Sequence, residues 1–513
     1  MYTPFLGEIK QFSGDYAPRD WAFCDGQLLE VKKHPQLHVL LRNRFGGDDV
    51  TTFALPDLRG RVPIHASSSY PLGSHGGQEQ VALTVAQLPA HTHPVYASGQ
   101  IIPNNVGPDH GYWGSINSTF AWTTGPGDQP MHPDSIKAAG QGQPHENRVP
   151  YVAVSYIISL IGIFPNRSLA AKSATEGHEW SLAEIRAFPY DFAPEGWAFC
   201  DGQTLAVVSN PSLFSLIGYS YGGSGNTFKL PDLRGKALLH AGNGYEVAKG
   251  GGESSHTLVI KEMAAHKHLP VASSKPSDEG NPKHNYWPRD KPYRDDNNTK
   301  LHPDALQKAG EDQPHDNMAP YLSLHYCIAL DGDFPVPTIW EDYTGAIKPF
   351  PMGKAFEFPW FPCDGRYLPT SQFPDLYKVI GNKYGGDSKM LRIPDLGGRV
   401  MIGQGKGEGL SRYQVGDKGG AAEVALTEAQ LPAHQHVPSA KIEGNFVGAN
   451  NTAVWANGAG KNTLGFATEP GTSPVMHSGT IGMEGESASH NNMMPYQVVQ
   501  FSINVKGIMP TPS

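Results

Sequence analysis

One block of sequence occurs three times in this chain, and this repetition limits the fold more than any other feature. Each copy contains a Cys-Asp-Gly motif, within WAFCDGQLL, WAFCDGQTL and WFPCDGRYL. A Gly-Gly turn, a Pro-Asp-Leu motif, a His-x-His pair and a closing apolar run follow in the same order. Repeats of this kind indicate one structural unit used several times. A site found in one unit is therefore expected in all three.

The repeats divide the 513 residues into three units and two connecting segments. The connecting segments, NRSLAAKSATEGHEW and PVPTIWEDY, have linker-like compositions. The predicted boundaries are residues 1–165 for the first unit, 166–182 for a linker, 183–335 for the second unit, 336–344 for a linker and 345–513 for the third unit.

Composition favours short strands and ordered loops within each unit. Glycine (59 residues) and proline (44 residues) are abundant, and charged residues make up 17% of the chain. We expect an opening strand at 7–14, a short helix at 211–218 that ends at a glycine, a capped turn at 427–430 and a buried closing strand within 151–164. The predicted fold class is α+β, rich in β structure, with much irregular loop.

The charge balance and the cysteine count exclude several classes of protein. The net charge is −9 and no run of lysine or arginine exceeds two residues, which argues against nucleic acid as a partner. No apolar run reaches membrane-spanning length, and the start of the chain does not resemble a signal peptide. Four cysteines are too few for a disulfide framework. We expect the motif cysteines Cys24, Cys200 and Cys363 to be small buried residues, with Cys327 an additional one.

The order of these motifs resembles a known protein family. GEIKQFSGDYAPRDWAFCDGQLL, FGGDDVTTFALPDLRGRV, GGQEQVALTVAQLPAHTH and NRVPYVAVSYIISLIGIFP are similar to the phage tail collar domain family, in particular its microcystin-dependent protein (MdpB-like) branch of tail-fibre proteins. The resemblance extends over each unit from end to end. This chain departs from the family in carrying three units where typical members carry one, and in reading MAAHKH and PDLGGR at single positions of the series.

The resemblance implies a non-enzymatic structural or adhesive protein of a phage tail or an extracellular, cell-surface appendage. Fibre members work as trimers, and in short tail fibres the His-x-His pairs of three chains are thought to hold one zinc ion on the threefold axis. Implied partners are a receptor, other fibre or appendage proteins, surface glycan and further copies of the chain. The corresponding histidines here are His91, His93, His266, His268, His434 and His436.

The spacing of these histidines suggests how one chain could supply a complete metal site. Residues i and i+2 of an extended segment point to the same side, so three pairs bring six imidazoles to one point. We hypothesise a single-chain pseudo-trimer with one divalent transition metal on its axis. Six nitrogens suit iron or nickel at least as well as the zinc that the resemblance implies. The alternative is a homotrimer of chains with three stacked layers of six histidines.

A second set of histidines repeats with an asparagine two residues later. We favour a side-chain network that pins the turn before the closing strand, and the alternative is a second polar site or axial ligands. His132, His302 and His477 are interpreted in the same way. The pairs in the second set are His145 with Asn147, His315 with Asn317, and His490 with Asn492.

The motif aspartates offer a different interpretation, in which carboxylates pair for acid–base chemistry. An aspartate beside glycine or proline is more typical of a turn, so we favour the structural role. A metal-dependent hydrolase acting on surface glycans is the alternative function, and a self-assembling filament subunit is the third. The aspartates concerned are Asp25, Asp57, Asp201, Asp232, Asp364 and Asp395.

The segment between the two histidine sets differs between units and is rich in glycine, asparagine and aromatic residues, as in 96–129. Loops of this length are commonly functional, and aromatic side chains suit sugar or protein surfaces. The alternative is that the aromatic residues pack the loops against themselves. The candidate receptor- or partner-binding residues are Tyr112, Trp113, Trp122, Tyr286, Trp287, Tyr293 and Trp455.

Overall fold

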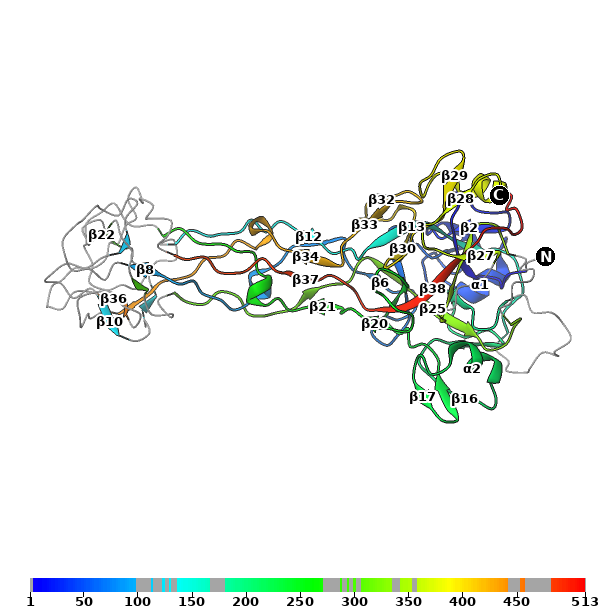
Figure 1. The fold of residues 1–513 in the computed structure, drawn as a ribbon, viewed down its shortest axis with the longest axis horizontal. Helices are drawn as coiled ribbons and strands as arrows, with labels where there is room; N and C mark the ends of the chain where they lie inside the picture. The colour runs from blue at the N-terminus through cyan, green and yellow to red at the C-terminus, as the bar shows by residue number, and fades with distance from the viewer. Residues whose placement is uncertain are drawn as a thin grey trace.

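The computed structural model is an elongated molecule with a wide end and a narrow stalk (Figure 1). Both chain termini lie at the wide end, and segments of all three units run side by side along the stalk. The structure describes residues 3–97, 136–166, 180–270, 306–334, 342–352, 358–441 and 481–512, with short stretches at 112–113, 122–124, 129–130, 287, 293–294, 299–300 and 453–456.

Each unit repeats one order of elements, with a short helix that begins at a proline, where the missing N–H costs nothing. The first unit contains β1 (Ile9–Phe12), β2 (Trp21–Phe23), β3 (Leu28–Glu30), α1 (Pro35–Leu41), β4 (Thr52–Ala54), β5 (Val62–His65), β6 (His75–Gly76), β7 (Gln80–Val81), η1 (Val85–Gln87), β12 (His145–Glu146) and β13 (Tyr151–Ser159). The second contains β14 (Ile185–Phe188), β15 (Trp197–Phe199), β16 (Thr204–Ala206), α2 (Pro211–Ile217), β17 (Gly223–Ser224), β18 (Thr227–Lys229), β19 (Ala237–His240), β20 (Gly250–Gly251), β21 (Ser255–His256), η3 (Ile260–Glu262), β24 (His315–Asp316) and β25 (Tyr321–Ala329).

The third unit follows the same plan, and further strands lie towards the far end of the stalk. The third unit contains β26 (Ala346–Phe350), β27 (Trp360–Pro362), β28 (Tyr367–Pro369), α3 (Pro374–Ile380), β29 (Met390–Arg392), β30 (Val400–Gly403), β31 (Gly405–Lys406), β32 (Arg412–Tyr413), β33 (Lys418–Gly419), β34 (Glu423–Ala425), η5 (Glu428–Gln430), β37 (Ser489–Asn491) and β38 (Tyr496–Asn504). The far strands are β8 (Tyr96–Ala97), β9 (Tyr112–Trp113), β10 (Trp122–Thr124), β11 (Gln129–Pro130), β22 (Tyr293–Arg294), β23 (Thr299–Lys300), β35 (Ser439–Lys441) and β36 (Ala453–Ala456).

The three units pair their closing strands in a cycle. The second half of each closing strand pairs with the opening strand of its own unit, as β13 does with β1. The first half pairs in parallel with a neighbouring unit: β13 with β30, β25 with β5, and β38 with β19. Within the described residues these strands belong to one 15-stranded sheet. The predicted β-rich fold with three tandem units is therefore confirmed, and the cycle of strand pairs is the arrangement that the single-chain pseudo-trimer hypothesis requires.

A ring of six buried charges connects the opening strands β1, β14 and β26. No side chain in this charge ring is more than 7% exposed. The ring is neutral because acids and bases alternate. The successive nitrogen–oxygen distances are Lys10–Asp342 2.7 Å, Asp342–Lys348 3.0 Å, Lys348–Glu184 3.0 Å, Glu184–Arg186 2.8 Å, Arg186–Glu8 2.7 Å and Glu8–Lys10 3.9 Å.

The third carboxylate of the charge ring comes from a different sequence position than the other two. Glu8 and Glu184 each precede the isoleucine that pairs with the same position of the closing strand, but the equivalent residue in β26 is Ala346. Asp342, four residues earlier, supplies the missing charge.

Both predicted linkers end in buried residues. Asp342 at the end of 336–344 is 1% exposed, and Trp180 and Leu182 at the end of 166–182 are 8% and 3% exposed. These residues are buried through contacts with distant parts of the chain, whereas most of both predicted linkers lies outside the described residues. Trp180, for example, packs against Phe5, with ring centroids 5.3 Å apart.

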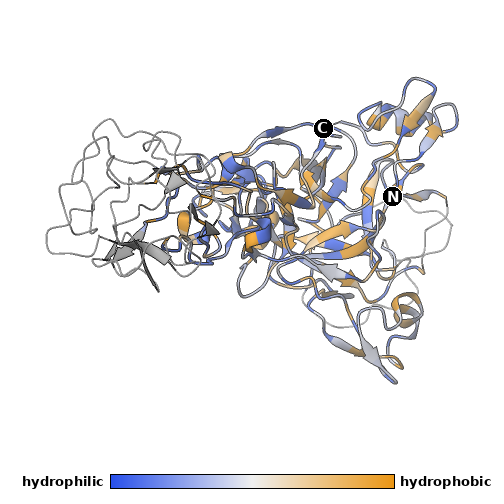
Figure 2. Ribbon diagram, turned by 60° about the vertical axis from the view of Figure 1, so that its left-hand side comes forward, coloured by the Kyte–Doolittle hydropathy of each residue, from blue (hydrophilic) through white to orange (hydrophobic). Residues whose placement is uncertain are grey.

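Several local predictions are confirmed. β13 is buried along its whole length, α2 ends before Gly218, and η5 carries the expected capping box. All four cysteines are free and buried. Hydrophobic strand segments gather in the wide end, coloured orange in Figure 2. No helix among the described residues is both long and apolar enough to cross a membrane.

Candidate metal centre

Three short 3₁₀ turns lead the chain into the His-x-His pairs. Before η1 and η5, the backbone N–H of a threonine donates to a glutamine three residues later, at 2.9 Å in both cases. In η3, Val259 N–H donates to Glu262 at 3.0 Å in the same way. The residues that end these turns are extended, with ψ between 138° and 147°. Each pair therefore begins in an extended segment, where i and i+2 share a side.

The structure brings the six histidines together as one buried cluster, which we call the six-histidine cluster. The rings of His91, His266 and His434 form one triangle, with centroids 4.9–5.3 Å apart. The rings of His93, His268 and His436 form a second triangle, and its three sides are all 4.8 Å. No histidine in the cluster is more than 4% exposed.

Backbone carbonyls fix the orientation of all six rings. In each pair the first histidine donates from Nδ1 to the carbonyl two residues before it, at 2.9–3.0 Å. In the second unit this acceptor is Ala264, so the departure from LPAHKH does not remove the bond. The second histidine donates from Nδ1 to a carbonyl of another unit, at 2.9–3.0 Å. Because a carbonyl only accepts, Nδ1 carries the proton and each Nε2 lone pair is left for a ligand.

Two spacings between Nε2 atoms are close to the edge length of an octahedral metal site. His266 Nε2 lies 3.2 Å from His93 Nε2 and 3.0 Å from His434 Nε2. With the proton on Nδ1, these pairs cannot hydrogen-bond to each other. Metal–nitrogen bonds of about 2.1 Å give octahedral edges of about 3.0 Å. The ring nitrogens lie within 4.8 Å of one another in two groups of four, which share His93 and His434, so the two stacked triangles suit an ion held by histidines of different units.

Backbone pairing also ties the six-histidine cluster across the units. His91 forms a bridge with Ala309 of the second unit, and His266 with Glu484 of the third. His434 completes the cycle with a bridge to Ala139 of the first unit. Every histidine pair is thus held by two units.

Burial keeps these histidines neutral. Desolvation lowers the pKa of His91 and His266 to about 4, of His436 to about 3, and of His93 and His268 to about 2. A neutral ring at physiological pH is the form that binds a metal.

The same shifts predict that acid destabilises the metal-free chain. The unfolded histidines protonate near their ordinary pKa of 6.5, whereas His91 in the folded chain protonates only near 4. Between these two pKa values the unfolded state therefore binds more protons than the folded state. The free energy of unfolding is at its full value above pH 6.5 and falls as the pH drops towards 4. The measurement is the thermal midpoint of metal-free protein from neutral pH down to about 4. The variant His266→Ala/His268→Ala is expected to have a shallower slope; an equal slope would contradict this origin.

The second histidine set shows a mixed outcome. The asparagines form the predicted network: Asn147 donates from Nδ2 to Gln78 and Met318 carbonyls at 3.1 and 3.0 Å. Asn317 and Asn492 make the equivalent pairs of bonds. The histidines do not join this network, and they face one another instead.

The motif aspartates lie in pairs, as Asp25 does with Asp57, but they serve local structure. Asp57 accepts two bonds from Arg59 at 2.9 and 3.0 Å, and Asp25 accepts from the Gln27 backbone at 3.2 Å. The other two units repeat the bridge between their motif aspartates. These contacts support the turn interpretation.

Five candidate aromatic residues lie in strands that join units near the far end of the stalk. Trp122 is opposite Trp455 in the pairing of β10 with β36. Trp113 is opposite Tyr293 in the pairing of β9 with β22, next to Tyr112. The first pairing joins units one and three, and the second joins units one and two.

The structure says little about the remaining candidate residues from the sequence. Tyr286, His132, His302 and His477 lie outside the described residues. Trp287 is 4% exposed, which fits the packing alternative for this residue.

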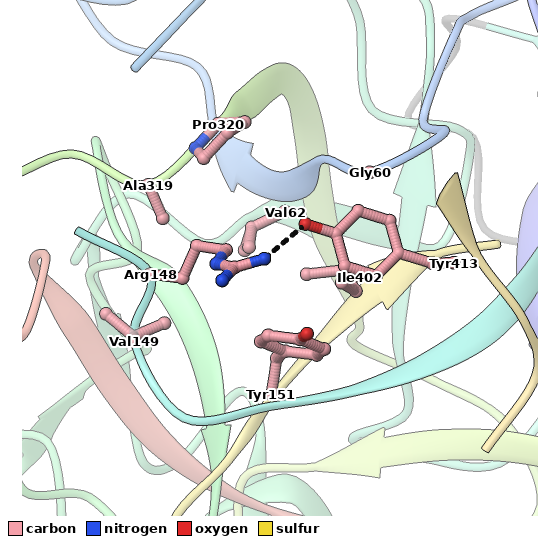
Figure 3. Close-up of a pocket in the computed structure, with 9 residues that line it drawn as sticks. All are labelled: Gly60, Val62, Arg148, Val149, Tyr151, Ala319, Pro320, Ile402 and Tyr413. Atoms are coloured by element: carbon pink, nitrogen blue, oxygen red, sulfur yellow. Dashed lines mark hydrogen bonds between the residues drawn. The ribbon is translucent and has the colours of Figure 1, made fainter. Parts of the chain in front are cut away.

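The pocket in Figure 3 lies between units and is filled by a polar network. Arg148 makes a bidentate ion pair with Glu146, at 2.7 and 2.6 Å, and donates to the Tyr413 hydroxyl at 3.0 Å. The space left admits about one water molecule, so it closes an interface and does not hold a larger ligand. It is lined by Gly60, Val62, Arg148, Val149, Tyr151, Ala319, Pro320, Ile402 and Tyr413.

Comparison with known proteins gives one family and one relative. Residues 7–63, 183–238 and 345–401 each match the family model of the Phage Tail Collar Domain. Protein RhiB of Rhizobium leguminosarum bv. viciae is 34% identical over 87 residues, which is 15% of this chain and 40% of that protein. The chain thus spans two fifths of the relative's length. No solved structure matches. The three segments that match the family model do not include either histidine set.

Proposed function

This chain carries three phage tail collar domains, and from that premise we propose a structural and adhesive role in a tail fibre or a related appendage. The three units of one chain take the place of the three chains of a fibre trimer. A divalent metal held by the six-histidine cluster ties the units together, and the far end of the stalk binds a receptor or partner.

The convergence of the three His-x-His pairs is the observation that carries this proposal. Two ligands from each unit meet at one point, with Nδ1 protons occupied and Nε2 lone pairs directed inward. A bound ion would be coordinatively closed, so it would cross-link the units and leave no position for a catalytic water. The stabilisation would fall on the interfaces between units, since no unit holds more than two ligands.

Zinc is the ion that the family resemblance favours, and the geometry widens the choice. Six imidazole nitrogens in an octahedral arrangement suit iron and nickel as well. Structural zinc is usually four-coordinate. Elemental analysis of the protein as purified would distinguish zinc, iron and nickel.

The paired strands near the far end support the binding role. Trp122 with Trp455 and Trp113 with Tyr293 occupy facing backbone positions contributed by different units. A receptor surface built there would combine residues of all three units. The sequences of the segments that would form this surface differ between the three units, and such a surface suits an asymmetric partner.

Native mass spectrometry of the untagged full chain tests the fused-trimer proposal. We expect the mass of one 55.5 kDa chain with bound metal, and we expect His266→Ala/His268→Ala to lose one ion. Both mass and metal are needed, because a homotrimer with three stacked sites has the same ratio of metal to chain. A three-chain mass would favour that homotrimer, and an unchanged metal content in the variant would overturn the shared site. Long filaments in electron micrographs of the purified chain would favour the filament subunit.

A further inference from the structure

A second histidine cluster lies in the stalk, apart from the six-histidine cluster. His145 of β12, His315 of β24 and His490 of β37 form a triangle with ring centroids 5.2, 5.3 and 5.4 Å apart. Each is 1% exposed. One ring nitrogen from each lies within 4.8 Å of those of the others. We call this group the three-histidine ring.

The nitrogens of this ring lack hydrogen-bond partners among the described residues. No nitrogen of His145 or His490 has a hydrogen bond of normal distance and angle to a residue that the structure describes, although the backbones of Val81 and Val424 lie close to these rings, and Nε2 of His315 is also unpaired. Only His315 Nδ1 has a partner, the Asp316 carbonyl at 3.1 Å. A buried polar group without a partner costs about 1–3 kcal/mol. Each histidine has at least one such atom, and one nitrogen from each lies within 4.8 Å of the others, an arrangement that suits a shared ligand better than packing alone.

Three further unpaired atoms lie two residues along the same segments. Asn147, Asn317 and Asn492 are fully buried, and the Oδ1 atom of each lacks a partner in the described part of the chain. Their amino groups donate to two backbone carbonyls each, and this fixes which amide atom is the oxygen. In an extended segment these residues share a side with the histidines. Three acceptors therefore accompany the three nitrogens.

We propose that the three-histidine ring is a second metal site, in which one nitrogen of each of His145, His315 and His490 binds a single divalent transition ion and water completes its coordination. Imidazole nitrogen is a common ligand for such ions, and three ligands leave positions open. The asparagine oxygens accept hydrogen bonds, so they suit coordinated water and disfavour an anion. The site does not depend on occupancy of the six-histidine cluster.

A fourth histidine packs against the ring but is not a ligand in this arrangement. His256 of β21 lies opposite His315, where the other units place Val81 and Val424 opposite their histidines. Glu253 and Glu262 occupy its two nitrogens at 2.6 and 3.0 Å. Its ring stacks on that of His490, with centroids 5.1 Å apart. His256→Val therefore restores the residue of the other units and is a matched control.

Counting zinc ions on the full chain by native mass spectrometry tests this proposal. Metal-free protein is loaded with zinc and freed of excess. We expect two ions on the wild type and on His256→Val. We expect one on His145→Gln/His490→Gln, retained by the six-histidine cluster, and this ion also reports that the variant folds. We expect one on His266→Ala/His268→Ala, held by the three-histidine ring.

X-ray absorption on zinc-loaded His266→Ala/His268→Ala identifies the remaining ligands. The expected spectrum has three imidazole nitrogens, with oxygen in the other positions. One ion on the wild type that disappears in His266→Ala/His268→Ala would overturn the second site. So would two ions on His145→Gln/His490→Gln, or a spectrum without imidazole. A wild type whose single ion is held by the three-histidine ring, with the six-histidine cluster empty, would instead contradict the proposed metal link between the three units.

Discussion

Replacing His266 and His268 together by alanine is expected to abolish metal binding at the six-histidine cluster and to lower the stability of the chain. These residues supply one ligand to each of the two triangles, so the variant loses the ligands of one whole unit and an ion could then join only the other two units. An ion present at about 1,000 times its Kd stabilises the folded state by about 4 kcal/mol. The measurement is the thermal midpoint of wild type and variant, each with and without a chelator.

The diagnostic result is the response to the chelator. Chelation should lower the midpoint of the wild type strongly and that of the variant much less. His75→Ala is the control, because His75 is exposed and belongs to neither histidine set. That variant should behave as the wild type does. If the His266→Ala/His268→Ala variant has the metal content and the thermal midpoint of the wild type, the six-histidine cluster does not bind a stabilising metal.

Local patterns in the sequence were sufficient to predict the elements of one unit. The apolar run that forms β13 and the proline-to-glycine segment that forms α2 are determined by neighbouring residues. The convergence of the His-x-His pairs could also be anticipated, because threefold repetition together with i, i+2 spacing leaves few other arrangements. What the repeats cannot reveal is which unit pairs with which, since β13 fits β1 and β30 through equally regular backbone bonds.

The charge ring escaped prediction for a different reason. Two units place the acid directly before the opening strand and the base two residues later within it, as Glu8 and Lys10 show. Comparing the units would have exposed Ala346 as the missing acid. Nothing local marks Asp342 as its replacement, because the contact between Asp342 and Lys10 spans 332 residues. The three-histidine ring likewise forms between distant segments of the chain. The sequence therefore predicts only a local turn network, and in the structure the asparagines form that network without the histidines.

Replacing Asp342 by asparagine is expected to lower the free energy of unfolding by about 3–5 kcal/mol, the usual cost of removing one partner from a buried ion pair. Asp342 bonds Lys10 at 2.7 Å and Lys348 at 3.0 Å. Burial alone would raise the pKa of Asp342, but the two lysines hold it well below its ordinary value, so its charge stabilises the folded state at neutral pH. The variant leaves both lysines buried without that charge. Urea unfolding at neutral pH measures the loss.

Two matched variants separate the charge from the general effect of substitution. Asp375→Asn breaks the exposed pair with Lys378, whose side chains are 56% and 64% exposed, and should cost less than about 1 kcal/mol. Asp342→Ala/Ala346→Glu moves the carboxylate to the position that Glu8 and Glu184 occupy in the other units. This double variant should be more stable than Asp342→Ala alone, because it restores alternation of charge around the ring. Equal stability of the two would show that position 342 acts through packing and not through its charge.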